Sequence, residues 1–444
     1  MDLKYQVVTF GCQMNEHDSE VLAGMMESLG YTHTDDINEC DAIIINTCCV
    51  RESAENKILG YIGNLKRLKR INPRLIIAVG GCMVQQQGAG EKLKKRASHV
   101  DIIFGTHNMY RLPQFINEVR HGGQILEIVD EECEIPEALP IKRQGKIKAQ
   151  ISIMYGCNNF CTYCIVPYVR GRERSLAPET IKNEFIALGN EGYQEVMLLG
   201  QNVNSYGQDF DYAFDFADLL KTLDETGKIS RIRYMTSHPR DFSKKLIDTI
   251  YECESVCEHF HLPIQSGSNR ILKFMNRGYT REFYLSLIEE IRKKFSYHSL
   301  TTDIIVGFPG ETEQDFKDTL ELFKEVEFDA AYTFLYSTRS GTPAAKMPDQ
   351  VASEVKKERL QQLMEVQNAI SLRINQRLVG KFEEILVEGT SKTSERTMTG
   401  RTRTNKIVNF PGEMDLAGKI IPVKITKAKT WHLEGEIIDQ MKKN

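Results

Sequence analysis

Short hydrophobic runs alternate with longer stretches of helical periodicity over the first hundred residues. The hydrophobic runs have the length of buried strands and lie at residues 5–10, 42–46, 75–80 and 102–104. The stretches between them, such as 15–29 and 52–71, have the pattern of amphipathic helices. This alternation predicts a doubly wound α/β domain, in which a parallel sheet carries helices on its faces.

The same alternation resumes near residue 149 and continues for longer. Six strands are predicted, each followed by a helical segment, at residues 149–155, 195–199, 231–236, 259–264, 302–306 and 330–336. Because eight such units close a barrel, six predict an open, partial (β/α)6 barrel. A long helix over residues 351–378 ends this part of the chain.

Beyond residue 381 the hydrophobic period changes to two. Alternating runs at 383–387, 407–410, 419–425 and 432–438 are separated by glycines, which predicts a small antiparallel β-barrel. Residues 133–148 change from acidic to basic and contain two prolines, Pro136 and Pro140, which is typical of a linker. The expected division is an N-terminal α/β domain, a linker, a partial-barrel core and a C-terminal barrel, at 1–122, 123–148, 149–379 and 380–444.

Composition narrows the class of protein only slightly. The chain has 444 residues, enough for about three domains, and a net charge of -4, so any attraction to nucleic acid must be local. No hydrophobic run is long enough to span a bilayer and the first residues lack a targeting pattern, so we expect a cytoplasmic protein with no membrane partner. In a reducing compartment, the eleven cysteines are better explained as cluster ligands and core thiols than as disulfides.

Three cysteines stand close together directly after the first strand of the core. They are Cys157, Cys161 and Cys164. Three thiolates can hold three irons of a 4Fe-4S cluster, and no fourth cysteine follows nearby, so one iron stays open. An open iron suits the amino and carboxylate groups of S-adenosylmethionine, whose carbon–sulfur bond breaks when the cluster supplies an electron. A zinc site with a distant fourth ligand and a set of buried thiols are the alternatives.

A second set of cysteines follows the strands of the N-terminal domain. Cys12, Cys48 and Cys82 each lie within two or three residues of a predicted strand end. Because the carboxyl ends of parallel strands meet at one edge, these thiols are expected to hold a second 4Fe-4S cluster with an open iron. The alternative is that they are small buried hydrophobic residues. Cys49 is predicted to be structural, since successive residues of an extended segment point to opposite sides.

Polar residues also follow the other strands of the core. Catalytic groups in this architecture come from the carboxyl ends of the strands. Those ends carry 200–202, Ser237 and His238, Gln265 and Ser266, 307–311, and Ser337. Polar loops are common in any protein, so each single instance is weak. A possible metal set, Cys253, Cys257, His259 and His261, is explained more simply by a helix running into a strand.

The C-terminal barrel contains a locally basic segment. Residues 391–406 have one acidic residue, Glu395, against five cations, which are Lys392, Arg396, Arg401, Arg403 and Lys406. These cations, with the threonines and asparagines between them, can donate to phosphate and sugar oxygens, which predicts RNA binding. A solvated loop without a ligand is the alternative.

The whole arrangement resembles a known family. The spacing Cys157-x3-Cys161-x2-Cys164 resembles that of the radical S-adenosylmethionine enzymes, and the strand-end cysteines with a basic TRAM-type barrel are similar to the methylthiotransferases. Residues 198–207 and 400–410 are similar to the branch that acts on isopentenylated adenosine in tRNA, the MiaB type. Relatives that act on threonylcarbamoyl-adenosine or on a ribosomal-protein aspartate share the cysteines. These relatives and a non-catalytic, zinc- and RNA-binding protein remain alternatives.

The resemblance implies an enzyme that installs a methylthio group on C2 of N6-isopentenyl-adenosine next to the anticodon. It implies two molecules of S-adenosylmethionine, one as methyl donor at the cluster of Cys12, Cys48 and Cys82, and one as radical source at the other cluster. It also implies a tRNA partner, an electron donor such as flavodoxin or ferredoxin, and a sulfur donor that the sequence does not identify.

The resemblance further implies residues that bind S-adenosylmethionine. Tyr163 is expected on its adenine and the turn of Gly200, Gln201 and Asn202 at its amino group, with Ser237, Gln265 and Arg270 as weaker candidates. Arg172 and Arg174 are expected to bind either the methionyl carboxylate or the tRNA backbone, because guanidinium groups suit both.

Overall fold

The N-terminal domain is built on a six-stranded sheet with the strand order β2-β1-β3-β4-β5-β6. The computed structural model describes residues 2–49, 52–129, 139–392 and 394–437. All pairs in this sheet are parallel, and its strands are β1 Leu3–Thr9, β2 Tyr31–His33, β3 Ala42–Thr47, β4 Ile76–Gly81, β5 Ile102–Phe104 and β6 Ile125–Glu127. The four central strands match the prediction. The edge strands β2 and β6 have three residues each, as β5 does, but β5 is fully buried and hydrophobic whereas β2 and β6 are partly exposed and include polar residues.

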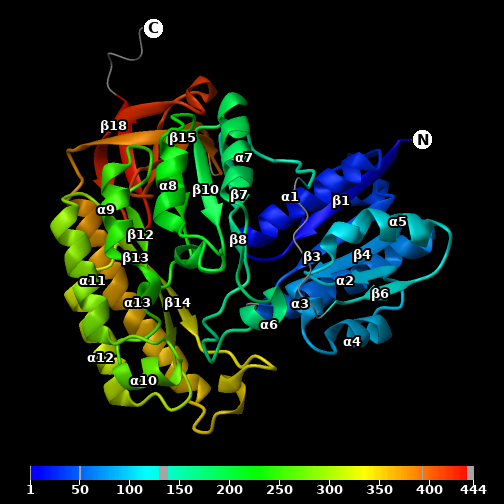
Figure 1. The fold of residues 1–444 in the computed structure, drawn as a ribbon, viewed down its shortest axis with the longest axis horizontal. Helices are drawn as coiled ribbons and strands as arrows, with labels where there is room; N and C mark the ends of the chain where they lie inside the picture. Colours follow the sequence, from blue (N-terminus) through cyan, green and yellow to red (C-terminus); the bar gives the residue numbers. More distant parts are fainter. Residues whose placement is uncertain (1, 50–51, 130–138, 393, 438–444) are drawn as a thin grey trace.

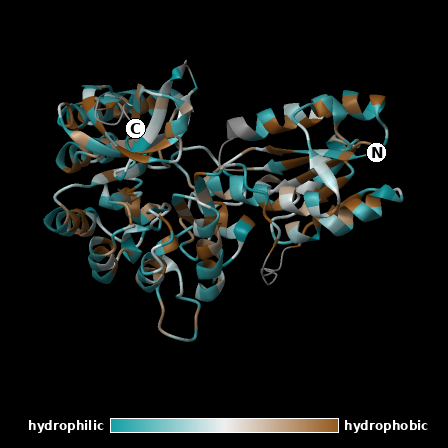
Figure 2. Cartoon of the chain, turned by 90° about the horizontal axis from the view of Figure 1, so that it is seen from above, coloured by the Kyte–Doolittle hydropathy of each residue, from teal (hydrophilic) through white to brown (hydrophobic). Residues whose placement is uncertain are grey.

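Helices cover both faces of this sheet. Because successive strand residues point to opposite faces, Ile44 packs with α1 and α5, whereas Ile43 and Ile45 pack with α2 and α4. The helices are α1 Gln13–Ser28, α2 Glu52–Ile71, α3 Cys82–Gln85, α4 Ala89–Arg96 and α5 Leu112–Arg120. Figure 2 shows hydrophobic strands between helices of mixed character in this domain. The predicted doubly wound arrangement is therefore confirmed.

The segment predicted as a linker contributes to the N-terminal domain at both of its described ends. Strand β6 lies within it and completes the sheet beside β5. Further along, Leu139 and Ile141 pack onto the α1 side of the domain, and the Lys142 N–H donates to Glu20 O at 2.9 Å. Residues 130–138, which include Cys133 and Pro136, lie outside the described residues. The folded part of the domain thus extends beyond residue 122.

The core is an open, curved sheet of six parallel strands. Strands β7, β10 and β11 form one half, β12, β13 and β14 form the other, and a bridge between Ile232 and Val256 joins them. The strands are β7 Lys148–Ser152, β10 Glu195–Leu199, β11 Arg231–Tyr234, β12 His259–His261, β13 Ser299–Val306 and β14 Ala330–Leu335. This confirms the predicted partial (β/α)6 barrel.

Helices on the outer side of the core bury one large hydrophobic cluster against these strands. They are α7 Pro178–Asn190, α8 Phe216–Asp224, α9 Lys244–Glu252, α10 Asn269–Phe274, α11 Arg281–Lys294, α12 Glu313–Val326 and α13 Ser353–Gln376. Several begin at a side-chain cap, as α12 does at Thr312, whose hydroxyl accepts from the Asp315 N–H. Among the described residues, no helix combines the length and the hydrophobicity needed to cross a membrane.

A short hairpin-like pair frames the loop that carries the three core cysteines. Strand β8 (Met154–Tyr155) pairs antiparallel with β9 (Arg174–Ser175), and the loop between them contains the helix α6 (Val166–Arg170). In Figure 1, α6 lies between the core and the N-terminal domain. The fold therefore holds the cysteine loop at the junction of the two domains.

The C-terminal domain is a closed five-stranded barrel with the strand order β15-β16-β17-β19-β18. Its strands are β15 Phe382–Ser391, β16 Ser394–Thr402, β17 Ile407–Pro411, β18 Ile420–Ala428 and β19 Leu433–Ile437. The basic segment 391–406 is not a loop, because most of it is strand β16, whose polar residues hide the period-two pattern. Figure 1 shows this barrel packed on the core at the end opposite α10.

Candidate active site

The loop after β8 brings Cys157, Cys161 and Cys164 together. Gly156 starts it with φ 78°, and a Cβ at this position would lie 1.8 Å from Arg172 O, so only glycine fits. The Cys157 N–H donates to Gly171 O at 3.0 Å, and the Cys164 N–H donates to Cys161 O at 2.9 Å. These bonds fold the loop tightly at the edge of the barrel.

Burial disfavours negative charge on these thiols unless a bound metal compensates it, and hydrogen-bond donors face two of the sulfur atoms. Burial raises the pKa of Cys157 to about 11 and that of Cys164 to about 12, and the neighbouring thiols add to both shifts. Hydrogen-bond donors already face the sulfur atoms: Arg277 Nη1 lies 3.4 Å from Cys161 Sγ, and Asn159 Nδ2 lies 3.5 Å from Cys157 Sγ. Because hydrogen bonds to sulfur stabilise and tune a thiolate-bound cluster, these residues fit an iron–sulfur cluster.

A cavity of about 980 Å³ opens beside this loop. Tyr163, Cys164 and Gln265 line it, and β14 forms its long wall. The Tyr163 hydroxyl lies 3.4 Å from Arg277 Nη1, so the same arginine contacts both the tyrosine and Cys161. Asn56 of α2 also lines the cavity, which therefore lies between the core and the N-terminal domain.

Buried polar atoms without a partner gather at the strand ends of the core. Within the described part of the chain, Ser237 Oγ, His238 Nε2 and Gln265 Oε1 have no hydrogen-bond partner. Thr236 and Gln265 have positive φ angles, 64° and 74°, which are rare for residues other than glycine. Unpaired buried polar atoms and backbone strain gather at functional sites, and here they suit a polar cofactor such as S-adenosylmethionine.

The turn after β10 holds neighbouring loops in place. Gln201 Oε1 accepts a hydrogen bond from the Gly156 N–H at the start of the cysteine loop. Asn202, 1% exposed, accepts from the His238 N–H at 3.1 Å and donates to Asp241 at 2.7 Å. Both side chains are thus engaged with protein atoms, so these two residues position the loops around the cavity.

Three predicted arginines lie outside the lining of this cavity. Arg270 is exposed, forms an ion pair with Asp315 and donates to Gly310 O at 2.6 Å, so its guanidinium is occupied at the surface of α10. The Arg172 guanidinium lies over the Phe160 ring, 4.4 Å from its centroid. Arg174 donates to Arg170 O at 3.3 Å. In these contacts, none of the three guanidinium groups donates a hydrogen bond to a cysteine sulfur.

The second set of cysteines lies at the carboxyl ends of three neighbouring strands. Cys12 follows β1, Cys48 follows β3, and Cys82 follows β4 directly. Neighbouring strands are about 4.8 Å apart, so the sheet brings the three backbone positions close together. Cys48 and Cys82 are buried and Cys12 is exposed. This is the arrangement that the strand pattern predicted.

One arginine of the core reaches into this second set. Arg170, at the end of α6, donates from Nε to Cys82 Sγ at 3.2 Å. It also donates to Asn15 at 3.1 Å and forms an ion pair with Asp18 at 2.6 Å. Arg170 and Asp18 are both buried. The sequence offered no signal for this contact beyond the position of Arg170 six residues after Cys164.

Cys49 lies with the second set of thiols, contrary to the sequence-based expectation. Its side chain is 1% exposed and packs with Cys82, Ile165 and Val169. A hydrogen bond between the two thiols, together with Arg170, lowers the pKa of Cys82 to about 6. The predicted orientation away from the second set is wrong, because β3 ends at Thr47 and the regular alternation of a strand does not extend to residues 48 and 49. A structural role for Cys49 stays a prediction.

Among the described residues, no three His, Cys, Asp or Glu side chains lie close enough together to share one metal ion. This geometry does not favour a zinc site. A cluster does not require this closeness, because each thiolate binds a different iron. In the weaker metal set, His259 and His261 both bond to Thr301 Oγ1, at 2.9 and 3.0 Å. They are therefore accounted for as core histidines.

The predicted RNA-binding residues divide into two groups. Lys392 and Arg396 are exposed on the β15–β16 hairpin. Arg403 pairs with Glu258 at 2.8 Å and Lys406 pairs with Asp329 at 2.5 Å, both in the core. Arg401 pairs with Glu388 of the barrel at 3.2 Å.

Two buried arginines complete the contact between barrel and core. Arg231 donates to Arg401 O at 2.7 Å, and Arg233 donates to Thr402 O at 2.7 Å. Both are at most 2% exposed. The barrel is therefore fixed to the core, and part of its basic segment forms that interface.

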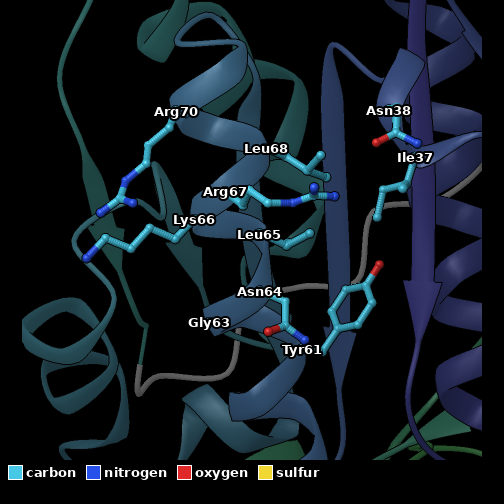
Figure 3. Close-up of a pocket in the computed structure, with 10 residues that line it drawn as sticks. All are labelled: Ile37, Asn38, Tyr61, Gly63, Asn64, Leu65, Lys66, Arg67, Leu68 and Arg70. Carbon is cyan, nitrogen blue, oxygen red and sulfur yellow. The ribbon is translucent and has the colours of Figure 1, made fainter.

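A separate hollow of about 650 Å³ lies beside α2 on the N-terminal domain. In Figure 3, Tyr61 and Arg67 point toward the short helix η1 (Ile37–Glu39), whereas Lys66 and Arg70 point away from it. The cations do not converge on one point, and none of the ten labelled residues is a predicted site residue. This hollow is unrelated to the two sets of thiols.

Three family models match successive parts of the chain. Residues 4–105 match the "Uncharacterized protein family UPF0004", residues 151–323 match the radical SAM superfamily, and residues 376–438 match the TRAM domain.

Solved structures share the fold at low sequence identity. The radical S-adenosylmethionine methyltransferase TsrM from Kitasatospora setae, with cobalamin and a 4Fe-4S cluster bound, has a TM-score of 0.57 at 13% identity and covers 78% of this chain and 77% of its own. The cobalamin-dependent radical enzyme OxsB, with aqua-cobalamin and S-adenosylmethionine bound, has a TM-score of 0.53 at 13% identity, over 82% of this chain and 56% of its own.

Fold and site together define the class: the chain is a radical S-adenosylmethionine enzyme with a TRAM domain, and an iron–sulfur cluster and S-adenosylmethionine are its cofactors. Curated relatives narrow this class. The tRNA-2-methylthio-N(6)-dimethylallyladenosine synthase of Pelotomaculum thermopropionicum is 56% identical over 97% of both chains, and that of Acetivibrio thermocellus is 55% identical over 98% of this chain and 91% of the relative. The chain belongs to the family of tRNA-2-methylthio-N(6)-dimethylallyladenosine synthases.

Proposed function

We propose that this chain installs a methylthio group on C2 of N6-isopentenyl-adenosine next to the anticodon of tRNA, with two clusters in one reaction space. One side chain carries this proposal. Ile165, next to Cys164, packs with Cys82 and also lines the cavity. This packing supports a single substrate base that both thiol sets could reach. The identity to relatives with this activity supports the same substrate over threonylcarbamoyl-adenosine or a ribosomal protein.

Cys157, Cys161 and Cys164 are the proposed ligands of the radical-generating cluster. When bound, that cluster supplies the electron that cleaves S-adenosylmethionine, and the resulting radical chemistry reaches a ring carbon that no side-chain base can deprotonate usefully. The protein contributes the donors from Arg277 and Asn159 to the sulfur atoms. It also contributes a cavity wall on β13 and β14 that contains the apolar side chains of Ile305, Phe334 and Leu335.

Cys12, Cys48 and Cys82 are the proposed ligands of the second cluster, where the sulfur and methyl groups are held for transfer. Arg170 places a cation beside these thiols. Its contacts to Asn15 and Asp18 fix its orientation, so the core and the N-terminal domain are held in register across the site.

The proposed cofactor-binding residues keep different roles. Tyr163 and Gln265 line the cavity and are proposed to contact S-adenosylmethionine, together with Ser237, whose buried hydroxyl lacks a partner among the described atoms. Gly200 offers backbone atoms only, because a Cβ there would lie 2.6 Å from Met154. Gln201 and Asn202 act by holding the loops.

The proposed partners follow from this reaction. The activity is proposed for the cytosol, where tRNA is present, with flavodoxin or ferredoxin as electron donor. We expect residues 1–122 to hold the second cluster, residues 149–379 to perform the radical chemistry, and residues 380–444 to make part of the RNA contact. The first of these units is extended by β6 and residues 139–142.

The direct test uses anaerobically reconstituted protein with an anticodon stem-loop that carries isopentenyl-adenosine. Mass spectrometry should show methylthiolation of that nucleoside and none of an otherwise identical loop with threonylcarbamoyl-adenosine. Cys161→Ala should abolish formation of 5'-deoxyadenosine, whereas Cys48→Ala should retain part of it and form no methylthio product. Cys253→Ala, a buried core cysteine outside both sets, is the matched control. A methylthiolated threonylcarbamoyl-adenosine would reassign the substrate, and equal loss of both products in the two variants would refute the proposed division between the clusters.

A further inference from the structure

Two exposed aromatic side chains stand at the far end of the cavity. Trp431 of the C-terminal barrel is 60% exposed and Tyr332 of β14 is 52% exposed, and both line the same cavity as Tyr163 and Cys164. Large aromatic side chains are usually buried, so two of them at the rim of a reaction cavity indicate a binding surface. The binding of cluster and cofactor does not account for them.

The turn that carries Trp431 is held firmly. It connects β18 and β19, and its Lys429 N–H donates to His432 O at 2.9 Å. Asn375 of α13, 5% exposed, donates to Lys429 O at 2.9 Å and to Thr430 O at 3.2 Å. Lys406 in turn donates to Asn375 Oδ1 at 3.0 Å. The indole is therefore presented by a supported turn, which lowers the entropic cost of binding a ligand to it.

Tyr332 is also supported from behind. The His261 ring lies edge-on to it, with 5.8 Å between the ring centroids. A smaller cavity of about 210 Å³ lies next to both aromatic residues and is lined by Arg401, Asn405, Lys406 and His432. Arg401 and Lys406 are already paired with Glu388 and Asp329, so the exposed rings are the feature that suits single-stranded RNA, whose bases stack on aromatic side chains.

The distance along β14 between Tyr332 and the cysteine loop determines which nucleotide can stack on Tyr332 and Trp431. Tyr336, in the cluster against which Tyr163 of the cysteine loop packs, lies four positions after Tyr332, which corresponds to about 13 Å along an extended chain. A base that reacts beside Cys164 cannot also stack at Tyr332. The rings are therefore suited to a nucleotide next to the reacting one, splayed out of the loop when the target base enters the cavity.

We propose that Trp431 and Tyr332 form a stacking platform for a base that flanks the modified adenosine in the anticodon loop. This inference rests on the proposed function, because it takes tRNA as the ligand. It gives the C-terminal barrel a part in placing the substrate at the active site, in addition to any contact of Lys392 and Arg396 with the RNA backbone.

Intrinsic fluorescence reports on this contact directly, because Trp431 is the only tryptophan in the chain. Binding of the stem-loop that carries isopentenyl-adenosine should quench the emission of the holoenzyme, with Trp431→Phe as the blank. Anisotropy of labelled RNA should show a loss of affinity of roughly 5- to 150-fold in Trp431→Ala, the range expected for one stacked base. Phe382→Ala, which removes another exposed aromatic residue of the barrel that lines neither cavity, should bind like the wild type.

A second RNA locates the stacked base. A stem-loop with abasic nucleotides on either side of the modified adenosine should bind the wild type more weakly and should lose little further affinity in Trp431→Ala, because both changes remove the same stacking interaction. Unquenched emission with unchanged affinity in Trp431→Ala would overturn the platform and leave the proposed function standing. Failure of the wild type to bind the intact stem-loop would instead overturn the proposed function itself.

Discussion

Replacing Arg170 by methionine tests whether the core and the N-terminal domain are joined through the second set of thiols. The guanidinium is 6% exposed and lies 2.6 Å from the Asp18 carboxylate, which is 4% exposed. Methionine fills a similar volume but leaves that carboxylate buried without its partner, and breaking a buried ion pair in this way costs about 3–5 kcal/mol. Arg170→Met should therefore lower the free energy of unfolding by about that amount.

The assay is anaerobic urea unfolding of the reconstituted protein, followed by circular dichroism, with iron counted on the same samples. Asp18→Asn combined with Arg170→Met removes the uncompensated charge and should recover much of the loss. Lys293→Met is the control, because Lys293 and its partner Glu289 are mostly exposed and such pairs contribute about 1 kcal/mol or less. If Arg170→Met costs no more stability than the surface control, or if the double variant is as unstable as the sum of the single variants, the ion pair between Arg170 and Asp18 does not join the two domains.

Three further predictions concern pH, the barrel and RNA. Burial lowers the pKa of His17 to about 4, so the unfolded state binds more protons than the folded state below pH 6.5. The free energy of unfolding should therefore fall by up to about 3 kcal/mol between pH 6.5 and 4. His17→Gln should flatten that part of the pH profile, and an unchanged profile would show that His17 is not the group responsible. Deletion of residues 381–444 should lower the melting temperature of the core, because Arg231 and Arg233 would lose their carbonyl acceptors in the barrel; calorimetry that shows an equally stable core would refute this. The double variant Lys392→Glu/Arg396→Glu should bind the stem-loop more weakly without a change in stability. The slope of log affinity against log salt should fall by roughly one for each phosphate that is no longer neutralised. An unchanged slope would exclude both residues from the RNA interface.

The strand pattern predicted most of the fold, because buried parallel strands leave a strong hydrophobic signal. The pattern did not show β2 and β6, because these short edge strands are partly exposed and include polar residues, unlike the equally short but buried β5. It did not show β16, because most residues of that strand are polar or charged. The placement of Cys12, Cys48 and Cys82 at neighbouring strand ends followed from topology alone.

Contacts between distant segments could not be predicted from the sequence. Arg277 meets Cys161 across 116 positions and Arg170 meets Cys82 across 88, and nothing local marks either arginine as different from a surface residue. The interface role of Arg403 and Lys406 was hidden for the same reason, because their acidic partners, Glu258 and Asp329, belong to the core. Local charge excess predicts a basic surface, and only the fold shows which cations are already paired.

The proposed reaction depends on two iron–sulfur clusters in this chain, each held by three cysteines. Iron and acid-labile sulfide should be counted after anaerobic reconstitution of the wild type and of two triple variants, Cys12→Ala/Cys48→Ala/Cys82→Ala and Cys157→Ala/Cys161→Ala/Cys164→Ala. We expect about eight irons per chain in the wild type and about four in each variant, with matching sulfide. About four irons in the wild type, or zinc without sulfide, would contradict this expectation.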